Sequence, residues 1–451
     1  MSRLSSFAGA RRRIALLGAA AALLALGLPA QAGVEVAGQS VGGDLPLMSA
    51  NVDVLGSIPM PGVIGARFKD NVMYVTGVEG LRTFDVSDPA LPKPLGQLPL
   101  PHFENEDVSL GGNTLIISAD QFVGFPNMIY VIDISNPALP TLRNQFQINV
   151  DAHIGNCVHD CRYVFITGDT GVYTYDTTTG AQVGRWATEI GGTHDIQFDS
   201  AGYAWVVGGN GTGGWDVTNP LAPRKVAMTD ARGNQSPYND FIHHNSFRPD
   251  VTPGVPGDVV LITEEDYLNA ACAPGTTPGV GPLRSQTLNP PGLFQSWKIN
   301  GPLSTTSPAV LTPIDTWSIG EGVLPAPEDS RAASAAFCSS HYFTESGGLV
   351  ANAWYQQGVR FLDVRDPANI RQVGYFVIPD GEVWAAHFAP TDPTQTIVYA
   401  LDLAHGIDIL RINRTDALNS VGTTMAPSIV STFPALSAPS EKWGWGCRIP
   451  V

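Results

Sequence analysis

The strongest constraint on the fold is a six-residue pattern that recurs along the chain. It appears in full as FDVSDP (84–89), IDISNP (132–137), WDVTNP (215–220) and LDVRDP (362–367). A fifth copy, Tyr175-Asp176-Thr177, lacks the proline, and Ile299-Asn300 and Ile412-Asn413 are degenerate copies with Asn in the Asp position. An Asp or Asn side chain accepts backbone N–H bonds in a turn, and Pro cannot extend a sheet ladder. Each copy therefore predicts a β-strand that ends in a tight turn.

The spacing of the copies predicts the architecture. In chain order, the copies at Asp85, Asp133, Asp176 and Asp216 are separated by 40 to 48 residues, the period of a four-stranded propeller blade. The apolar runs between them are short and rich in Val, Ile, Tyr and Phe, and no long segment after residue 32 has a helical period. We therefore expect an all-β fold, a single seven-bladed β-propeller of four-stranded antiparallel blades over residues 52–437. Either residues 52–58 or residues 429–433 would complete the last blade.

The first 32 residues have the features of a cleaved signal peptide. Four arginines at positions 3 and 11–13 precede an apolar stretch at 14–28 and the small-residue site Ala30-Gln31-Ala32. We expect a secreted or periplasmic protein with a short N-terminal extension at 33–51 and a C-terminal tail at 438–451. The pattern leaves open whether the folded or the unfolded chain is exported. No later segment predicts a transmembrane span.

The charge of the chain argues against one class of partner. Loss of the signal peptide would take the formal charge from −16 to about −20. A surface of this sign does not hold nucleic-acid phosphates by counterion release. We therefore expect no nucleic-acid partner.

Five cysteines remain after the predicted cleavage site. Cys157 and Cys161 flank three residues between two apolar runs, which predicts a disulfide across a hairpin turn. Cys272 and Cys338 are the expected second pair, and Cys447 is left over. Half of a zinc site is the alternative for the first pair.

Ionisable residues recur where the innermost strand of each blade is expected to begin. The second blade has Glu106 there, the first has no ionisable residue, and the later blades have histidines. Because innermost strands line the channel of a propeller, we expect these side chains to converge at one mouth of it. The predicted metal ligands are His153, His194, His243, His244, His341 and His387. Only one of His243 and His244 faces the channel in a regular strand, and the sequence leaves open which one.

Imidazoles around a narrow axis indicate a divalent transition metal, copper first and then iron, zinc or manganese. Glu264 and Glu106 are the predicted catalytic acid or base groups. Asp195, His405 and Asn245 are predicted to orient the ligands. The alternative is that each histidine is a polar group that lines a wet channel.

Two stretches, GLRTFDVSDPALPKPLG (80–96) and GVRFLDVRDPANIRQVGYF (358–376), resemble the LVIVD-repeat proteins. This resemblance implies a secreted β-propeller over nearly all of the mature chain and carries little information about chemistry.

Three shorter stretches are similar to the selenium-binding protein and methanethiol oxidase family, which has a propeller-like fold and is linked to copper. They are AHIGNC, IHHNSF followed by VVLITEED, and LDLAHGIDIL. This similarity implies functional roles for His153, His244, Glu264 and His405. Asn156 stands where that family has a second histidine.

Two functions follow from these patterns. The first is an exported propeller with a metal site at one channel mouth, acting on a small-molecule substrate as an oxidase, hydrolase or lyase. The second is a non-catalytic propeller that binds a protein, peptide or glycan on its face, because a fold does not set a function.

Overall fold

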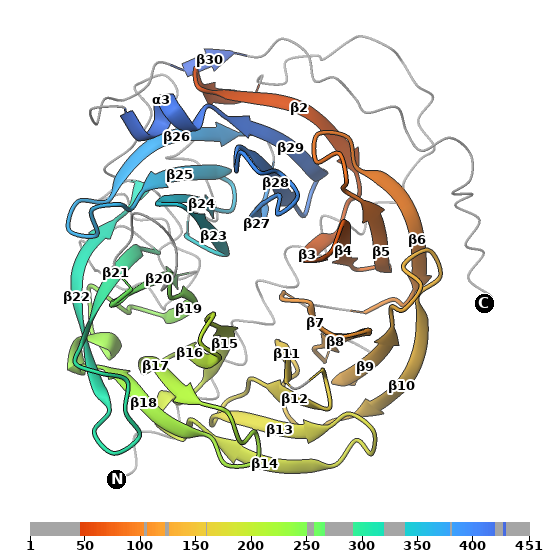
Figure 1. Cartoon of the computed structure of the whole chain (residues 1–451), viewed down its shortest axis with the longest axis vertical. Helices are drawn as coiled ribbons and strands as arrows, with labels where there is room; N and C mark the ends of the chain where they lie inside the picture. The colour runs from red at the N-terminus through yellow and green to blue at the C-terminus, as the bar shows by residue number, and fades with distance from the viewer. Residues whose placement is uncertain are drawn as a thin grey trace, which may run out of the picture. The chain divides into compact units, whose positions relative to one another are not determined.

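The computed structural model describes residues 46–102, 106–121, 126–158, 160–249, 257–266, 292–319, 339–378, 381–419 and 427–429. Within this part of the chain, six β-sheets are arranged around a common centre, each with its innermost strand toward that centre (Figure 1). The predicted signal peptide and C-terminal tail lie outside the described residues. None of the helices in the described part is long and apolar enough to cross a bilayer.

The first three sheets follow the chain order, and each contains four antiparallel strands. The first comprises β3 (Val63–Lys69), β4 (Val72–Gly77), β5 (Gly80–Asp85) and β6 (Lys93–Pro99). The second comprises β7 (Ser109–Gly111), β8 (Thr114–Ala119), β9 (Met128–Asp133) and β10 (Thr141–Gln147). The third comprises β11 (Gly155–Val158), β12 (Tyr163–Ile166), β13 (Val172–Asp176) and β14 (Gln182–Trp186).

An eight-stranded sheet follows, built from two antiparallel groups of four strands. The first group comprises β15 (Thr193–Phe198), β16 (Tyr203–Gly208), β17 (Gly211–Asp216) and β18 (Arg224–Thr229). The second group comprises β19 (Ile242–Phe247), β20 (Val259–Glu265), β21 (Phe294–Asn300) and β22 (Ala309–Trp317). The outer strands β18 and β22 run parallel and join the two groups.

The last two sheets contain strands from both ends of the sequence. One comprises β23 (Phe343–Ser346), β24 (Leu349–Ala353), β25 (Val359–Asp363), β26 (Arg371–Val377), β1 (Leu47–Ser49) and β30 (Pro427–Ile429). The other comprises β27 (Val383–Phe388), β28 (Ile397–Asp402), β29 (Gly406–Ile412) and β2 (Val52–Pro59). The described part of the chain also has three helical segments, η1 (Thr188–Ile190), η2 (Ala231–Asn234) and α3 (Arg414–Asn419).

Strand β2 closes the sequence into a ring of sheets. It pairs antiparallel with β29, with Val52 opposite Ile412. Residues 52–58, one of the two predicted segments, therefore complete the last sheet. Ile429 pairs instead with Leu47 in the neighbouring sheet, and residues 430–433 lie outside the described part of the chain.

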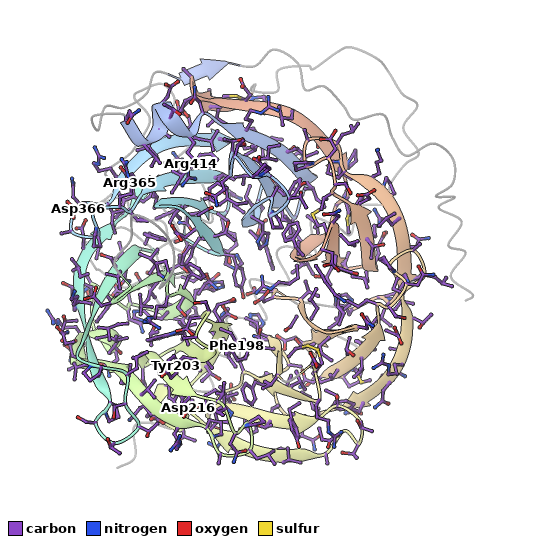
Figure 2. The ribbon with its side chains drawn as sticks, viewed as in Figure 1. Phe198, Tyr203, Asp216, Arg365, Asp366 and Arg414 are labelled. Carbon is purple, nitrogen blue, oxygen red and sulfur yellow. A yellow bond between two sulfur atoms is a disulfide. The ribbon has the colours of Figure 1, made fainter. Side chains whose placement is uncertain are left out.

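The recurrent aspartate ends the third strand of its sheet. Its Oδ1 accepts the backbone N–H two residues later at 2.9–3.1 Å in five copies: Asp85, Asp133, Asp176, Asp216 and Asp363. The Asp or Asn before each proline makes a second turn of this kind at 3.1 Å, as at Asn219 and Asp366. Figure 2 labels Asp216 and Asp366, which lie toward the outside of their sheets. The turn chemistry that the sequence predicted is therefore present.

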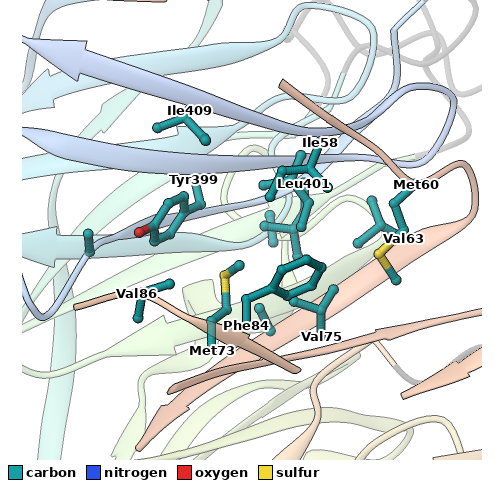
Figure 3. Close-up of a cluster of buried hydrophobic side chains, with 14 of the residues drawn as sticks. Ile58, Met60, Val63, Met73, Val75, Phe84, Val86, Tyr399, Leu401 and Ile409 are labelled. Atoms are coloured by element: carbon teal, nitrogen blue, oxygen red, sulfur yellow. The ribbon is translucent and has the colours of Figure 1, made fainter. Parts of the chain in front are cut away.

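Apolar side chains between neighbouring sheets form the core. In one cluster, Met73 and Val75 of β4 pack with Tyr399 and Leu401 of β28 and with Ile58 of β2, all of them buried (Figure 3). Burying one such side chain contributes about 1.5–3 kcal/mol. Because every sheet packs in this way on the next, the inner strands are held in fixed positions around the centre.

The predicted disulfide between Cys157 and Cys161 is present at the turn that joins β11 to β12. Cys272 and Cys338 lie outside the described residues.

Candidate metal centre

Four histidines meet around Glu106, and all five residues lie in or just before the innermost strand of a group of four strands. Glu106, His153 and His341 lie just before β7, β11 and β23, and His194 and His244 lie within β15 and β19. Glu106 Oε2 lies 3.2 Å from His153 Nε2, 3.7 Å from His194 Nε2 and 3.3 Å from His244 Nε2. Glu106 Oε1 lies 3.7 Å from His341 Nε2. The structure thus brings together these five predicted site residues.

Glu265 joins this group from the end of β20. Its Oε1 lies 3.5 Å from His341 Nε2, and its Oε2 lies 3.9 Å from His244 Nε2. The phenol of Tyr355 donates a hydrogen bond to Oε1 of Glu265. We call the four histidines with Glu106 and Glu265 the central cluster.

Hydrogen bonds behind two of the histidines fix which ring nitrogen faces Glu106. His153 Nδ1 lies 2.9 Å from Oδ2 of Asp120, and His341 Nδ1 lies 2.5 Å from the carbonyl oxygen of Trp384. A carbonyl only accepts, as does an ionised carboxylate, so each Nδ1 carries the proton. In a neutral ring the Nε2 lone pair then points into the cluster, which is the arrangement of a metal-binding histidine.

Several atoms inside the cluster face one another without forming hydrogen bonds. Glu106 Oε1, His244 Nε2 and His341 Nε2 are buried, and none has a hydrogen-bond partner. Buried polar atoms are normally satisfied, so a set that converges without hydrogen bonds needs an explanation. The donor set suits a divalent transition metal, because imidazole nitrogen and carboxylate oxygen are both ligands for such ions.

The pKa shifts reflect burial and mutual charge. Burial acts to raise the pKa of Glu106, but the charges on His153 and His341 outweigh it and hold that pKa well below its ordinary value. Burial, with His341 next in effect, lowers the pKa of His244 to about 3. Burial and the neighbouring His244 likewise lower the pKa of His194. Burial acts to lower the pKa of His153 and of His341, but the charge of Glu106 outweighs it and raises both. Glu106 is thus ready to bind a metal ion beside neutral His194 and His244, whereas an ion would displace a proton from His153 and from His341.

The inner strands are irregular at the cluster. The pairing register shifts in β15 between Thr193 and Ile196 and in β19 between His243 and Asn245. Such bulges re-aim side chains and break the strict alternation of a strand. Two consecutive side chains can therefore both point toward the centre of the propeller. His244 contacts Glu106, and Asn245 donates to Asp195 next to it.

The structure places His243 outside the cluster and His244 inside it. His243 Nδ1 lies 2.8 Å from Thr212 Oγ1, and its Nε2 lies 3.0 Å from the carbonyl oxygen of Tyr238. Both ring nitrogens are thereby used, so His243 links β19 to Thr212 of β17 and to the backbone at Tyr238.

Glu264 also points away from the cluster. One of its oxygens accepts the backbone N–H of Asp240, and the other accepts that of Leu293 at 3.2 Å. It holds two chain segments together, and the neighbouring Glu265 occupies the place expected for Glu264.

His387 and His405 do not belong to any set of candidate ligand residues in the described part of the chain. The ring of His387 packs edge-on against Phe68 at 5.9 Å. The backbone N–H of His405 donates to Asp402 Oδ1 at 3.1 Å.

A second polar layer is built around Asp107, Asp195 and Asn245, each of which directly follows a cluster residue. Asp195 Oδ2 accepts from Asn245 Nδ2 at 2.6 Å and from Gln197 Nε2 at 2.9 Å. Gln197 also donates to Asp107 at 2.8 Å, and Arg67 forms an ion pair with Asp107. Burial, and then the charge of Asp107, raises the pKa of Asp195 to about 7. This layer ties β15, β19 and the segment before β7 together directly next to the ligands.

The sequence reasoning missed Asp120 as well as the role of Glu265. Asp120 directly follows β8, the second strand of its sheet, just as Glu265 ends the second strand β20. The turns after second strands open on the same face as the starts of the inner strands, so the topology offered a signal for both residues.

Exposure indicates where the cluster is reached from solvent. The side chains of His153 and Asp120 are 23% and 18% exposed, whereas those of Glu106, His244 and His341 are almost fully buried. Within the described residues, the approach to the cluster therefore lies between the second and third sheets.

Comparison with known proteins extends the fold assignment but not the chemistry. No protein-family model matches the chain, and no curated protein matches it. The β-propeller domain of Cps50 (Swd1) from Myceliophteria thermophila is similar with a TM-score of 0.51 at 12% identity, covering 80% of this chain and 100% of that one. The WD40 repeats of RRP9 are similar with a TM-score of 0.50 at 10% identity, covering 81% and 98%.

At these identities the likeness concerns the fold alone, and with the all-β sheets around a centre it shows a β-propeller. The LVIVD-repeat and selenium-binding resemblances stay predictions.

Proposed function

We propose that this chain is a seven-bladed propeller enzyme that binds a divalent transition metal in the central cluster and acts on a small-molecule substrate. The blade count takes the eight-stranded sheet as two blades. The observation that carries the proposal is the convergence of four imidazoles and two carboxylates, with Nδ1 of His153 and His341 fixed from behind.

Some of these residues would bind the metal ion, and others orient the ligands. His153, His194, His244 and His341 would hold the ion together with Glu106, while Asp120 fixes the ring of His153. A bound ion would supply Lewis-acid or redox chemistry, which fits an oxidase, hydrolase or lyase. Copper is the first expectation, followed by iron, zinc and manganese. We also propose that the protein is exported, on the strength of residues 1–32.

Metal content is the direct test. The mature protein, purified without a histidine tag, would be analysed by plasma mass spectrometry beside a His153→Ala/His244→Ala double variant. His387→Gln is the matched control, because this buried histidine lies outside the central cluster. We expect near-stoichiometric metal in the wild type and the control, and loss of it in the double variant. A wild-type protein that stays empty after reconstitution with copper, iron, zinc and manganese would refute the proposal.

A second candidate is a non-catalytic propeller that binds a partner on the opposite face. It is favoured by exposed leucines at the same turn of three sheets, after the proline of the repeat: Leu91, Leu139 and Leu221, which are 46%, 66% and 48% exposed. These turns join third and fourth strands and so lie on the face away from the central cluster. A partner that spans several blades on this face would cover these side chains together. If the wild-type protein binds no metal, partner binding becomes the proposed function.

A further inference from the structure

The geometry points to a dinuclear centre in which Glu106 bridges two metal ions. This inference rests on the proposed metal centre and goes beyond it in stoichiometry and in the division of the ligands. One ion would be held by His153 and His194, and the other by His244, His341 and Glu265.

The candidate ligands separate into two sets that share Glu106. Glu106, His153 and His194 form one set, and Glu106, His244 and His341 form another. Within each set, all candidate ligand atoms lie within 4.8 Å of one another. His153 and His341 share no such set.

The two oxygens of Glu106 face the outermost members of the two sets. Oε2 lies 3.2 Å from His153, and Oε1 lies 3.7 Å from His341, while His194 and His244 between them both approach Oε2, at 3.7 and 3.3 Å. Ligand atoms of a single ion lie about 2.0–2.2 Å from it, so they are at most about 4.4 Å apart. One ion would therefore have to draw His153 and His341 together, while two ions about 3.5–4 Å apart would use each histidine close to where it lies.

The remaining carboxylates complete the division. Glu265 lies closest to the second set, with Oε1 at 3.5 Å from His341 Nε2 and Oε2 at 3.9 Å from His244 Nε2. Asp120 lies behind the first set, at 2.9 Å from His153 Nδ1. Glu106 would thus lie between the two divalent ions, with Asp120 behind the first set and Glu265 beside the second. The negative charge would be spread evenly over the two ions. A third grouping, His194 with His244 and Glu265, lies across the two sets and is where a single ion would sit instead.

Titration with Co²⁺ tests the inference. The metal-free protein would be titrated and followed by visible absorption, with bound cobalt measured by plasma mass spectrometry after gel filtration. His153→Ala and His341→Ala each remove one ligand from a different set, and His387→Gln is the control. Thermal melting of each metal-free protein by circular dichroism checks that the variants fold.

We expect two equivalents of cobalt in the wild type and the control, and one equivalent in each single variant. Saturation of the wild type at one equivalent would overturn the dinuclear centre and leave the proposed metal site intact. Saturation at zero equivalents would overturn both. The wild-type titration decides between these outcomes even if a variant does not fold.

Discussion

His153 Nδ1 lies 2.9 Å from Oδ2 of Asp120, while Nε2 of the same ring lies 3.2 Å from Oε2 of Glu106. The imidazole is therefore clamped between two carboxylates that belong to the second blade of the propeller. Because Nδ1 keeps its proton and donates it in a hydrogen bond to Asp120, Nε2 is the atom left for a metal ion.

Replacing Asp120 with Asn should weaken metal binding without abolishing it. Partners behind a ligating histidine typically account for about a 10–100-fold difference in metal affinity. The measurement is competition against a chelator of known affinity. Asp169→Asn is the control, because Asp169 lies in the corresponding turn of the next blade, between β12 and β13. Equal affinities of the Asp120 variant and the wild type would show that the clamp has no role in binding.

The adjacent residues Glu264 and Glu265 should behave in opposite ways. Glu265→Gln should lower metal content, because Glu265 contacts His244 and His341. Glu264→Gln should keep the metal but reduce the free energy of unfolding by about 1–3 kcal/mol, since an amide cannot accept both backbone N–H groups of Asp240 and Leu293. Metal analysis and urea denaturation of both variants check this. The reverse pattern would make Glu264 the ligand.

Asp216→Ala should destabilise the propeller by about 1–2 kcal/mol at neutral pH. Asp216 Oδ1 accepts from Thr218 N at 3.0 Å and Oγ1 at 2.6 Å, and Oδ2 forms an ion pair with Arg224 at 2.6 Å. Hydrogen bonds from Thr218 lower the pKa of Asp216, so its contribution is present above the unfolded pKa of about 3.9 and is lost as the pH falls below it. Asp216→Asn keeps the Oδ1 acceptor and should retain most of the stability in urea denaturation. Equal losses in both variants would assign the effect to charge alone.

The stability of the protein relative to Asp408→Asn should fall between pH 4 and pH 7. Burial, and then the charge of Asp402, raises the pKa of Asp408 to about 7. Because the folded state then holds a proton that the unfolded state has released, each step upward in pH favours unfolding in this window. A shift of this size corresponds to up to about 4 kcal/mol. Unfolding curves of both proteins at four pH values check it, and parallel pH profiles would show that Asp408 ionises normally.

The repeat pattern contained most of the fold. Because the Asp at the end of each third strand forms its turn with residues two positions away, local chemistry alone specified where β5, β9 and β17 end. Even the degenerate copies were informative, since β21 ends at Asn300 and β29 ends at Ile412, next to Asn413.

The central cluster could be predicted only in part, because its details depend on irregular backbone. Topology was enough to bring His153, His194, His341 and Glu106 together. The choice of His244 over His243 depends on the bulge in β19, and strict alternation cannot foresee a bulge. His387 was predicted as a ligand, but its ring packs against Phe68 instead. No sequence pattern predicts a tertiary contact of this kind.

The pairing of Val52 with Ile412 has a consequence for biosynthesis. Strand β2 emerges from the ribosome near the start of translation, but its partner β29 follows only near the end. During that interval β2 lacks its one sheet partner among the described strands, so its backbone groups are free to pair with other chains, and long-range pairing of this kind is slow to form. The exposed Asp53 on β2 places a charge on that edge, opposite Arg411 in the finished sheet. A newly made chain is therefore most vulnerable to aggregation just before its ring closes.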